Sequence, residues 1–234
     1  MIETRLIIAC DGEQLSVVRT SNGKLDSPCV VLLHGAGRAN KERTLPLARD
    51  LADAGVDTIS FDFSGHGYST GALEKLSLER RLRQARGVIE NLTSDEVGLF
   101  LIGFSMSGQT VADLIQVYGS RIERIVLCSP AVYSRSAWPL AFGDGFTDEI
   151  RIPDGWRNSS ALQNLSKFTG RAVLALPGED VVIPTAVTHE IEQALNRKAD
   201  LVCLTFGQAG HQLGGWFAER AEARKMLIKA LLAD

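Results

Sequence analysis

The sequence predicts an α/β fold in which helices cover both faces of a mostly parallel sheet. The main evidence is a repeated alternation between short apolar runs and longer segments whose apolar residues recur every three or four positions. Length and composition agree, because 234 residues with 45% hydrophobic and 23% charged side chains are ordinary values for one globular domain. No repeat, low-complexity tract or linker divides the chain, so we expect a single domain over residues 1–234.

The first half of the chain predicts a hairpin followed by alternating strands and helices. Residues 5–10 and 13–20 flank an Asp11-Gly12 pair, which favours a tight turn between two strands. Ser77 is suited to cap a helix over residues 78–92, where apolar residues have helical spacing. The other elements expected here are strands at 29–33, 57–63 and 97–102 and helices at 43–54 and 109–118, each of these two followed by a glycine.

The second half continues the alternation after one long interruption. The elements expected here are strands at 122–127, 172–176 and 201–206 and helices at 185–195 and 220–232. Parallel sheets covered by helices carry their ligand sites at the carboxyl ends of the strands. We therefore expect the chemistry in the segments that leave these strand ends.

Residues 131–171 form the interruption, a stretch far longer than a usual connection in a compact domain. An aromatic-rich insertion that leaves from strand ends is a candidate lid over an apolar pocket. We therefore expect a short cap at about residues 131–171 whose rings line that pocket. The alternative is that the rings only anchor the segment to the body of the protein. The rings are Tyr133, Trp138, Phe142, Phe146, Trp156 and Phe168.

Charge, cysteine usage and the N-terminus exclude several classes of protein. The formal net charge is −3 and no basic stripe is present, which argues against nucleic acid or an anionic membrane as a partner. The first residues lack a signal-peptide pattern, and no apolar run is long enough to cross a bilayer. The four cysteines show neither a C-x-x-C motif nor the spacing of a metal site. We expect a reduced, cytoplasmic protein without a membrane span.

A serine in a turn between a strand and a helix is the candidate nucleophile. Two G-x-S tripeptides occur, ending at Ser69 and Ser105, and the tripeptide alone carries little information. Ser105 stands between an apolar run and a helical segment, whereas Ser69 lies in a polar loop. A tight turn of the first kind projects its central side chain above the sheet. The start of the following helix directs backbone N–H groups toward a developing oxyanion.

Among the four histidines, His211 is the candidate base. A serine hydroxyl is a weak nucleophile and needs a base, which in turn needs an orienting acid. His211 follows the last expected strand in a glycine-rich loop, so it should lie on the same rim as Ser105. His34 and His66 lie in loops before Ser105, and His189 falls on the solvated face of its helix.

The orienting acid should leave another strand end. The strand expected at residues 172–176 runs into a segment that offers two carboxylates, Glu179 and Asp180. Their position along the chain leaves both open.

Two backbone amides are the candidate oxyanion donors. Residues 34–37 (HGAG) follow the first buried strand, and small residues there let the backbone approach a bound carbonyl closely. The Ala36 amide is the expected donor from this loop, with Gly35 as the alternative. The Met106 amide, directly after Ser105, is the expected second donor.

Together these features resemble the α/β-hydrolase superfamily, and the resemblance covers essentially the whole chain. The matching motifs are the oxyanion loop at 34–37, the D-x-x-G-x-G-x-S loop at 61–69 (FDFSGHGYS), the nucleophile elbow at 103–108 (GFSMSG) and the Gly-His pair at 210–211. The chain is most similar to small single-domain esterases and to lipase-like or acyl-peptidase-like enzymes. It departs from the family pattern at Ser107, where glycine is usual, and in the shortness of its cap.

The resemblance implies a catalytic triad in the order serine, acid, histidine, which Ser105, Asp180 and His211 follow. It favours Asp180 over Glu179, because the family's aspartate stands four residues before a proline, as Asp180 stands before Pro184. The acid loop is one residue shorter than is common, which keeps Glu179 as the alternative.

The implied reaction is hydrolysis of a carboxylic ester, a thioester or a small amide through an acyl-enzyme on Ser105, with His211 as general base. We expect a small-molecule acyl substrate, ester rather than peptide cleavage, short to medium uncharged acyl chains, and no metal or other cofactor. Dehalogenase and epoxide hydrolase readings are disfavoured, because those relatives place an aspartate where this chain has Ser105. Two alternatives stay open: acyl transfer or carbon–carbon bond hydrolysis with the same triad, and ligand binding with a vestigial triad.

Overall fold

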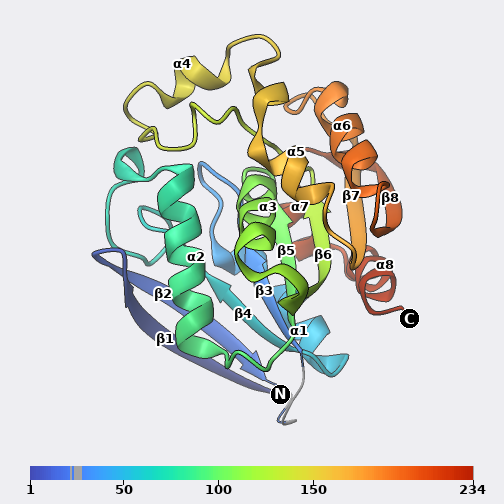
Figure 1. The fold of residues 1–234 in the computed structure, drawn as a ribbon. Helices are drawn as coiled ribbons and strands as arrows, with labels where there is room; N and C mark the ends of the chain where they lie inside the picture. The colour runs from blue at the N-terminus through green and yellow to red at the C-terminus, as the bar shows by residue number, and fades with distance from the viewer. Residues whose placement is uncertain (22, 24–27, 234) are drawn as a thin grey trace.

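The computed structural model describes residues 1–21, 23 and 28–233. Its centre is a sheet with the strand order β1-β2-β4-β3-β5-β6-β7-β8 (Figure 1). The pairs β1–β2 and β2–β4 are antiparallel, and all other neighbours in the sheet are parallel. This confirms the expected α/β fold. The strands are β1 (Ile2–Cys10), β2 (Glu13–Ser21), β3 (Cys29–Leu33), β4 (Asp57–Phe61), β5 (Leu99–Phe104), β6 (Ile122–Cys128), β7 (Arg171–Glu179) and β8 (Asp200–Gly210).

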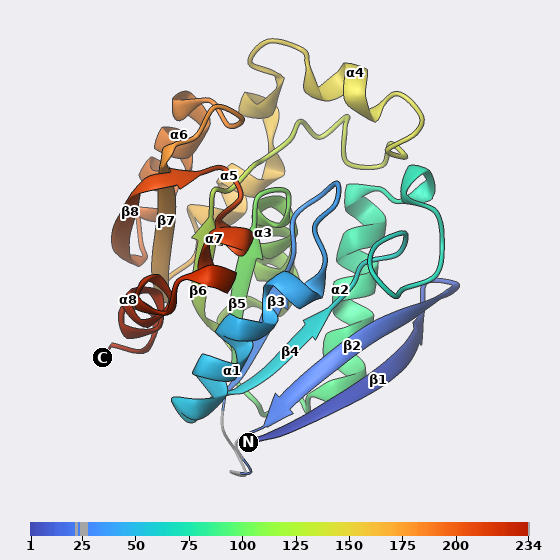
Figure 2. The ribbon, with the colours of Figure 1, turned by 180° about the vertical axis from the view of Figure 1, so that it is seen from behind.

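Helices cover both faces of the sheet (Figure 1, Figure 2). One face packs against α2, α3, α5 and α6, and the opposite face packs against α1, α7 and α8. The short helix α4 lies above the carboxyl ends of the strands (Figure 1). The helices are α1 (Leu45–Asp53), α2 (Leu78–Leu92), α3 (Ser107–Tyr118), α4 (Phe146–Ile150), α5 (Ser160–Leu165), α6 (Thr185–Leu195), α7 (Leu213–Glu219) and α8 (Ala221–Leu232).

The hairpin at the edge of the sheet follows from its Asp-Gly pair. Asp11 and Gly12 both have positive φ angles, 54° and 75°. Two such residues form the turn whose twist matches that of the flanking strands. Cys10 therefore pairs with Glu13, and β1 and β2 stay in register along their whole length.

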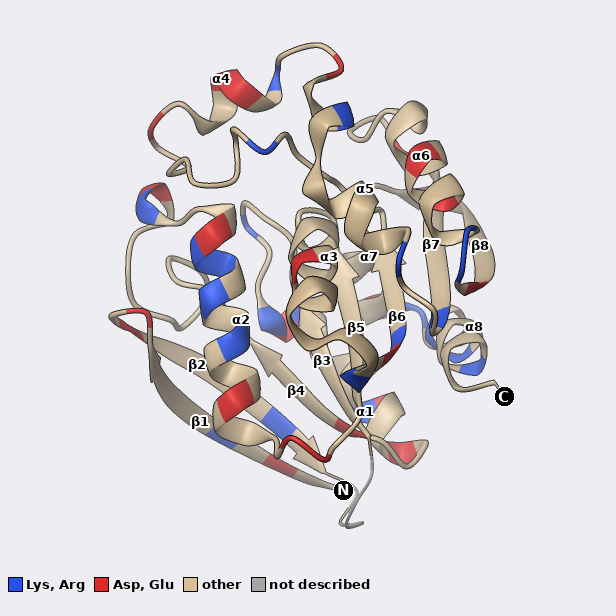
Figure 3. Cartoon of the chain, viewed as in Figure 1, with Lys and Arg blue, Asp and Glu red and all other residues tan. Residues whose placement is uncertain are grey.

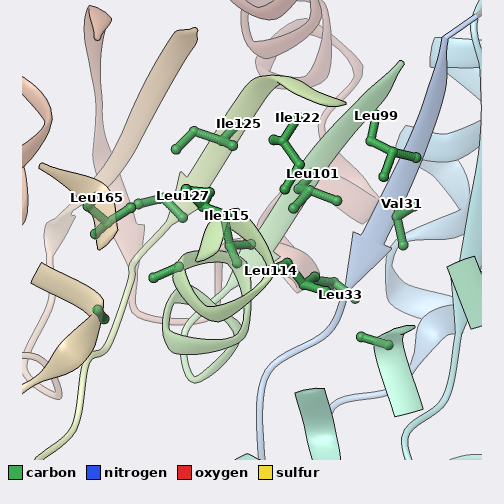
Figure 4. Packing of buried hydrophobic residues seen from close by; sticks show 14 of the residues in the cluster. Val31, Leu33, Leu99, Leu101, Leu114, Ile115, Ile122, Ile125, Leu127 and Leu165 are labelled. Carbon is green, nitrogen blue, oxygen red and sulfur yellow. The ribbon is translucent and has the colours of Figure 1, made fainter. Parts of the chain in front are cut away.

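The interior strands are buried on both faces, and β3 and β5 are almost entirely apolar. Every residue of β3, β4 and β5 is buried. On one face, Val31, Leu101 and Leu127 belong to the same core cluster as Leu114 and Ile115 of α3 (Figure 4). Full burial of each such side chain contributes about 1.5–3 kcal/mol. This layer holds the strand ends in place, and the site lies at those ends.

Differences from the expected elements lie mainly near the carboxyl edge of the sheet. β5 begins at Leu99 and continues to Phe104, because its last two residues still pair with β6. β8 continues to Gly210, so the glycine-rich segment expected as a loop belongs to a strand. Helices α4, α5 and α7 are only five to seven residues long. They lack a sustained hydrophobic period, and the sequence does not predict them.

The segment 131–171 is tied to α3 through a buried carboxylate. Asp113 is 6% exposed and accepts hydrogen bonds from the Trp138 indole N–H (3.0 Å) and the Gln109 amide (2.9 Å). Gln109 Oε1 in turn accepts hydrogen bonds from the Tyr133 N–H and the Ser159 hydroxyl, both at 3.1 Å. Burial raises the pKa of Asp113 to about 6, although the Trp138 and Gln109 hydrogen bonds oppose this change.

We expect Asp113 to lower the stability of the protein as the pH rises. Its folded-state pKa is above the ordinary value of 3.8, so the unfolded chain loses this proton first and stability falls between about pH 4 and pH 6. The fall amounts to about 3 kcal/mol at most. Denaturant unfolding of wild type and Asp113→Asn at several pH values measures it: the stability difference between them should change over this range. Asp144→Asn, at an exposed position without a side-chain ion pair among the described residues, is the control, and a pH-independent difference contradicts the prediction.

Candidate active site

Ser105 lies at the apex of a strained turn between β5 and α3. Its φ angle is +50°, a region that residues other than glycine rarely adopt. Three backbone hydrogen bonds hold this conformation: the Ser105 N–H donates to Cys128 O (2.8 Å), and its carbonyl accepts from the N–H groups of Gly108 (2.8 Å) and Ala131 (3.0 Å). The turn therefore projects the hydroxyl away from the sheet, as a nucleophile elbow does.

Glycines on either side of Ser105 allow close packing: Gly103 lets β5 approach α3, and Gly108 lets α3 approach the segment after β6. A Cβ atom added at Gly103 would lie 2.7 Å from Val111 Cγ2, and one added at Gly108 would lie 2.8 Å from Pro130 Cβ. Real Cβ atoms do not make contacts this short. The third small residue of the elbow, Ser107, makes hydrogen bonds that are described below.

The pairing of β7 with β8 brings Asp180 and His211 together. Glu179 pairs with Gly210 across the two parallel strands, so the next residue in each strand lies beside the other. The His211 Nδ1 atom is 3.0 Å from Asp180 Oδ2, and its Nε2 atom is 2.9 Å from Ser105 Oγ. The structure thus brings the three residues expected as a triad into one hydrogen-bonded row.

Asp180, and not Glu179, is the carboxylate that meets His211. The Asp180 Oδ1 atom accepts hydrogen bonds from the N–H groups of Val182 (2.8 Å) and Ile183 (3.0 Å), which fix the orientation of the carboxylate. Partial burial raises the pKa of Asp180, but the hydrogen bonds from His211 and the two amides outweigh it, and the pKa is lowered overall. Asp180 therefore stays ionised at neutral pH. Glu179 is exposed on β7.

The expected oxyanion loop closely approaches the nucleophile. A Cβ atom at Gly35 would lie 3.3 Å from Ser105 Cβ, so only glycine fits here without displacing a neighbour. The buried His34 side chain fixes the loop: its Nε2 accepts a hydrogen bond from the Phe63 N–H (3.1 Å), which leaves Nδ1 as the donor to Gly35 O (2.7 Å). Burial lowers the pKa of His34 well below its ordinary value, so the ring is neutral.

The two expected oxyanion donors lie on either side of Ser105. Ala36 belongs to the loop after β3, and Met106 precedes the first residue of α3. Within the described residues, neither backbone N–H donates a hydrogen bond to another group of the protein. Both amides are therefore available to a bound carbonyl oxygen, and their role stays a prediction.

A buried arginine joins the oxyanion loop to the elbow, and the sequence analysis missed it. Arg81 of α2 is completely buried, and its Nη2 donates to His34 O and to Ser107 Oγ, both at 2.7 Å. The Ser107 hydroxyl also donates to His34 O (2.7 Å). The guanidinium stacks on the Phe63 ring, with 3.7 Å from Cζ to the ring centre. Ser107, a departure from the family pattern, thus links the elbow to the loop.

The signal for Arg81 is present in the sequence. Arg81 follows Leu78 by three positions and precedes Ala85 by four, so it falls on the apolar stripe of α2. A charged residue on a buried stripe indicates a specific partner. Burial lowers the pKa of Arg81 to about 9, and the group stays protonated at neutral pH.

A cavity of about 520 Å³ opens beside Ser105 and His211. Its walls come from the loop after β3, the residues that follow Asp180, and the start of α7. Among the six aromatic residues expected to line it, only Tyr133 does so. The rings of Phe142 and Phe146 instead pack against each other at a tilt of 52°, with their centres 4.6 Å apart, in a separate cluster.

The expectation of an aromatic pocket is therefore wrong, because most of these rings anchor the segment 131–171 to the body. Trp156 and Phe168 pack against the main core, and Trp138 packs in the same cluster as Phe146. Two arginines, Arg38 and Arg43, line the cavity instead. The sequence pattern does not predict either arginine as a site residue.

The described part of the chain has neither a metal-binding cluster nor a membrane-spanning helix. The described part of the chain holds no group of three or more His, Cys, Asp or Glu side chains placed to bind a metal ion. None of its helices has the length and apolar character needed to cross a membrane. All four cysteines are free.

Comparison with protein families gives one match, and it spans slightly more than half of the chain. A family described as serine aminopeptidase, S33, matches residues 26–147. This range includes the loop after β3, the elbow and the beginning of the segment 131–171. No curated protein matches the chain in sequence.

Solved structures of hydrolases resemble the whole chain. Est1E from Butyrivibrio proteoclasticus, with ferulic acid bound, has a TM-score of 0.73 and 19% identity and covers 98% of this chain and 100% of its own. The enol-lactonase from Burkholderia xenovorans LB400 has a TM-score of 0.73 and 18% identity, covering 96% and 99%. A CIB-like hydrolase from Thermoplasma acidophilum has a TM-score of 0.72 and 15% identity, covering 98% and 97%. At these identities the likeness shows a shared fold.

Proposed function

We propose that this chain, which belongs to the serine aminopeptidase S33 family and has the α/β-hydrolase fold, hydrolyses small esters through a covalent acyl-serine. The observation that carries the proposal is the row of two hydrogen bonds from Ser105 through His211 to Asp180. This arrangement activates a hydroxyl and has few other uses at the mouth of a cavity. Thioesters and small amides are included in the proposed substrate class.

The proposed reaction has two steps. In the first, His211 Nε2 takes the proton from Ser105 Oγ, which attacks the carbonyl carbon. The Ala36 and Met106 amides stabilise the oxyanion, and His211 then protonates the leaving alcohol. In the second step, His211 takes a proton from the water that attacks the acyl carbon, and it passes this proton to Ser105 Oγ as the acyl–oxygen bond breaks and the acid is released. Asp180 stabilises the positive charge that His211 carries in both steps.

Ester cleavage fits the cavity better than removal of an N-terminal amino acid. An aminopeptidase must hold the free ammonium group of its substrate, and carboxylates are the usual partners of an ammonium. Among the described residues that line the cavity there is no Asp or Glu, whereas Arg38 and Arg43 are both present. These cations repel an ammonium group.

A substrate panel tests the proposed class directly. We expect p-nitrophenyl esters of two to eight acyl carbons to be hydrolysed, and aminoacyl p-nitroanilides to be hydrolysed at least about a hundredfold more slowly in kcat/KM. Preference for the anilides with a free amino group would contradict ester hydrolysis and favour a peptidase.

The acid side of the pH profile should show the loss of a single proton. Asp180 has a lowered pKa, so it is ionised from about pH 5 upward, and only the proton that the general base must lose limits activity there. The logarithm of kcat/KM should therefore rise with pH with a limiting slope of one. A slope of two above pH 5 would contradict the role of Asp180, and a flat profile from pH 5 to 9 would contradict that of His211.

Arg81 should affect catalysis through the position of the oxyanion loop. Arg81→Met keeps the volume of the side chain but removes both hydrogen bonds to the loop and the elbow. We expect kcat to fall by about tenfold to a hundredfold while KM changes little, because a displaced donor weakens only the transition state. Arg83→Met, on the half-exposed face of the same helix, is the control. An equal effect on KM, or no effect, would contradict the positioning role.

A further inference from the structure

The active-site cavity carries positive charge that no carboxylate among the described residues neutralises. Arg38 and Arg43 both line the cavity and are exposed to solvent. In the described residues, Arg38 has no hydrogen bond or ion pair, and Arg43 donates only to the neutral Gln212 side chain, at 2.9 Å. Basic positions mark the loop after β3 in Figure 3. The cavity is thus cationic in a protein whose net charge is −3.

Both arginines are linked through the chain to the reacting groups. Arg38 lies two residues after Ala36, in the loop whose glycine approaches Ser105. Arg43 is held by Gln212, the residue directly after His211. An anionic group bound between the two guanidinium groups therefore lies in the same cavity as the nucleophile and the base.

The remaining lining residues include an apolar group that suits the hydrocarbon part of a substrate. Phe104, Tyr133, Val182, Ile183 and Leu213 contribute to this second surface. The lining of this cavity of about 520 Å³ therefore combines apolar side chains with two cationic ones. This differs from the sequence expectation of uncharged acyl chains.

We propose that the substrate is an anionic ester whose carboxylate binds Arg38 and Arg43 while its ester carbonyl meets Ser105. Guanidinium groups bind carboxylates with paired, charge-assisted hydrogen bonds, which neutral side chains do not match. The proposal rests on the proposed ester hydrolysis and narrows its substrate class. The carboxylate belongs either to the acyl part or to the alcohol part of the ester, and the test separates these two cases.

Two matched ester pairs test the proposal. In the acyl pair, the p-nitrophenyl monoester of adipic acid is compared with p-nitrophenyl 6-methylheptanoate, in which an isopropyl group replaces the carboxylate. In the alcohol pair, 4-carboxyphenyl hexanoate is compared with phenyl hexanoate. The measured quantity is the preference, defined as kcat/KM of the anionic ester divided by that of its neutral counterpart.

We expect wild type to prefer the anionic ester by about tenfold or more in one of the two pairs, and that pair identifies the charged part of the substrate. The preference should fall by at least about tenfold in the double variant Arg38→Gln/Arg43→Gln, and by part of that in each single variant. It should also fall as the salt concentration rises, because both arginines are exposed. Arg197→Gln, an exposed arginine after α6 that does not line the cavity, should leave the preference unchanged.

The outcomes separate this proposal from the proposed function. A preference near or below one in both pairs, or a preference that survives in the double variant, overturns the anionic substrate. If neutral esters are still cleaved in a Ser105-dependent way, ester hydrolysis then stands alone. If no ester of either pair is cleaved in a Ser105-dependent way, the proposed function and this inference both fail. Thermal melting of each variant confirms that the compared proteins are folded.

Discussion

Replacement of Ser105 by alanine should lower kcat for ester hydrolysis by about 10⁶-fold. The hydroxyl is the atom that attacks, and no neighbouring group can substitute for it at the apex of the turn. The variant should fold normally, because alanine is no larger than serine and the three backbone hydrogen bonds of the turn do not involve the side chain. Steady-state kinetics with a p-nitrophenyl ester, together with thermal melting, measures both expectations.

Ser120→Ala is the matched control for this substitution. Ser120 is exposed at the end of α3 opposite the elbow, so its loss should change kcat by less than about twofold. A Ser105→Ala variant that is folded and keeps more than about a hundredth of the wild-type activity would contradict an acyl-serine mechanism.

Asp180→Asn should lower kcat by about 10⁴-fold. The asparagine keeps the shape of the side chain but removes the negative charge that stabilises protonated His211. An asparagine amide can also donate a hydrogen bond to His211. The imidazole is then no longer held in the tautomer whose Nε2 accepts the proton of Ser105. The pH profile of the residual activity should flatten, because the charge that supports the base is gone.

Glu179→Gln is the control for this second prediction, since Glu179 is the adjacent carboxylate. It is exposed on β7 and should change kcat by less than about twofold. A larger loss in Glu179→Gln than in Asp180→Asn would contradict the assignment of the acid. The double variant should be no worse than Asp180→Asn alone if Glu179 makes no contribution.

Local patterns in the sequence predict most of the fold. The helix α6 has the expected bounds, and so does β3, because a strong hydrophobic period or a continuous apolar run specifies each of them. The Ser77 side chain caps α2 as expected, accepting a hydrogen bond from the Arg80 N–H. These features depend on neighbours a few residues apart, and such neighbours are visible in a sequence.

The errors arise where distant segments decide the structure. Gly207 to Gly210 have a composition typical of a loop, yet they extend β8 because β7 continues beside them and supplies pairing partners. The same pairing brings Asp180, and not Glu179, to His211. The positions of these two carboxylates along the chain could not distinguish them. Composition therefore identifies the candidate groups, and strand pairing selects among them.

The polar residues around the site were the hardest to predict. Arg81 joins the loop at His34 to the elbow at Ser107, two segments that are far apart in the sequence. Arg38 and Arg43 have the composition of ordinary surface residues, and only the cavity shows that they face the site. The aromatic residues of 131–171 were expected to line the cavity, but most of them anchor this segment to the body of the protein. Aromatic content alone does not distinguish these two roles.

Covalent labelling of Ser105 is the most direct test of the central claim, that this serine is activated. A fluorophosphonate reacts with a serine only when a base and an oxyanion site activate it, so the test does not depend on knowing the substrate. Wild-type protein and Ser105→Ala are incubated with the probe, and the modified peptide is mapped by mass spectrometry. We expect one label, on Ser105, that is absent from the variant. A folded wild-type protein that takes up no label, or one labelled on another residue, would contradict an activated Ser105.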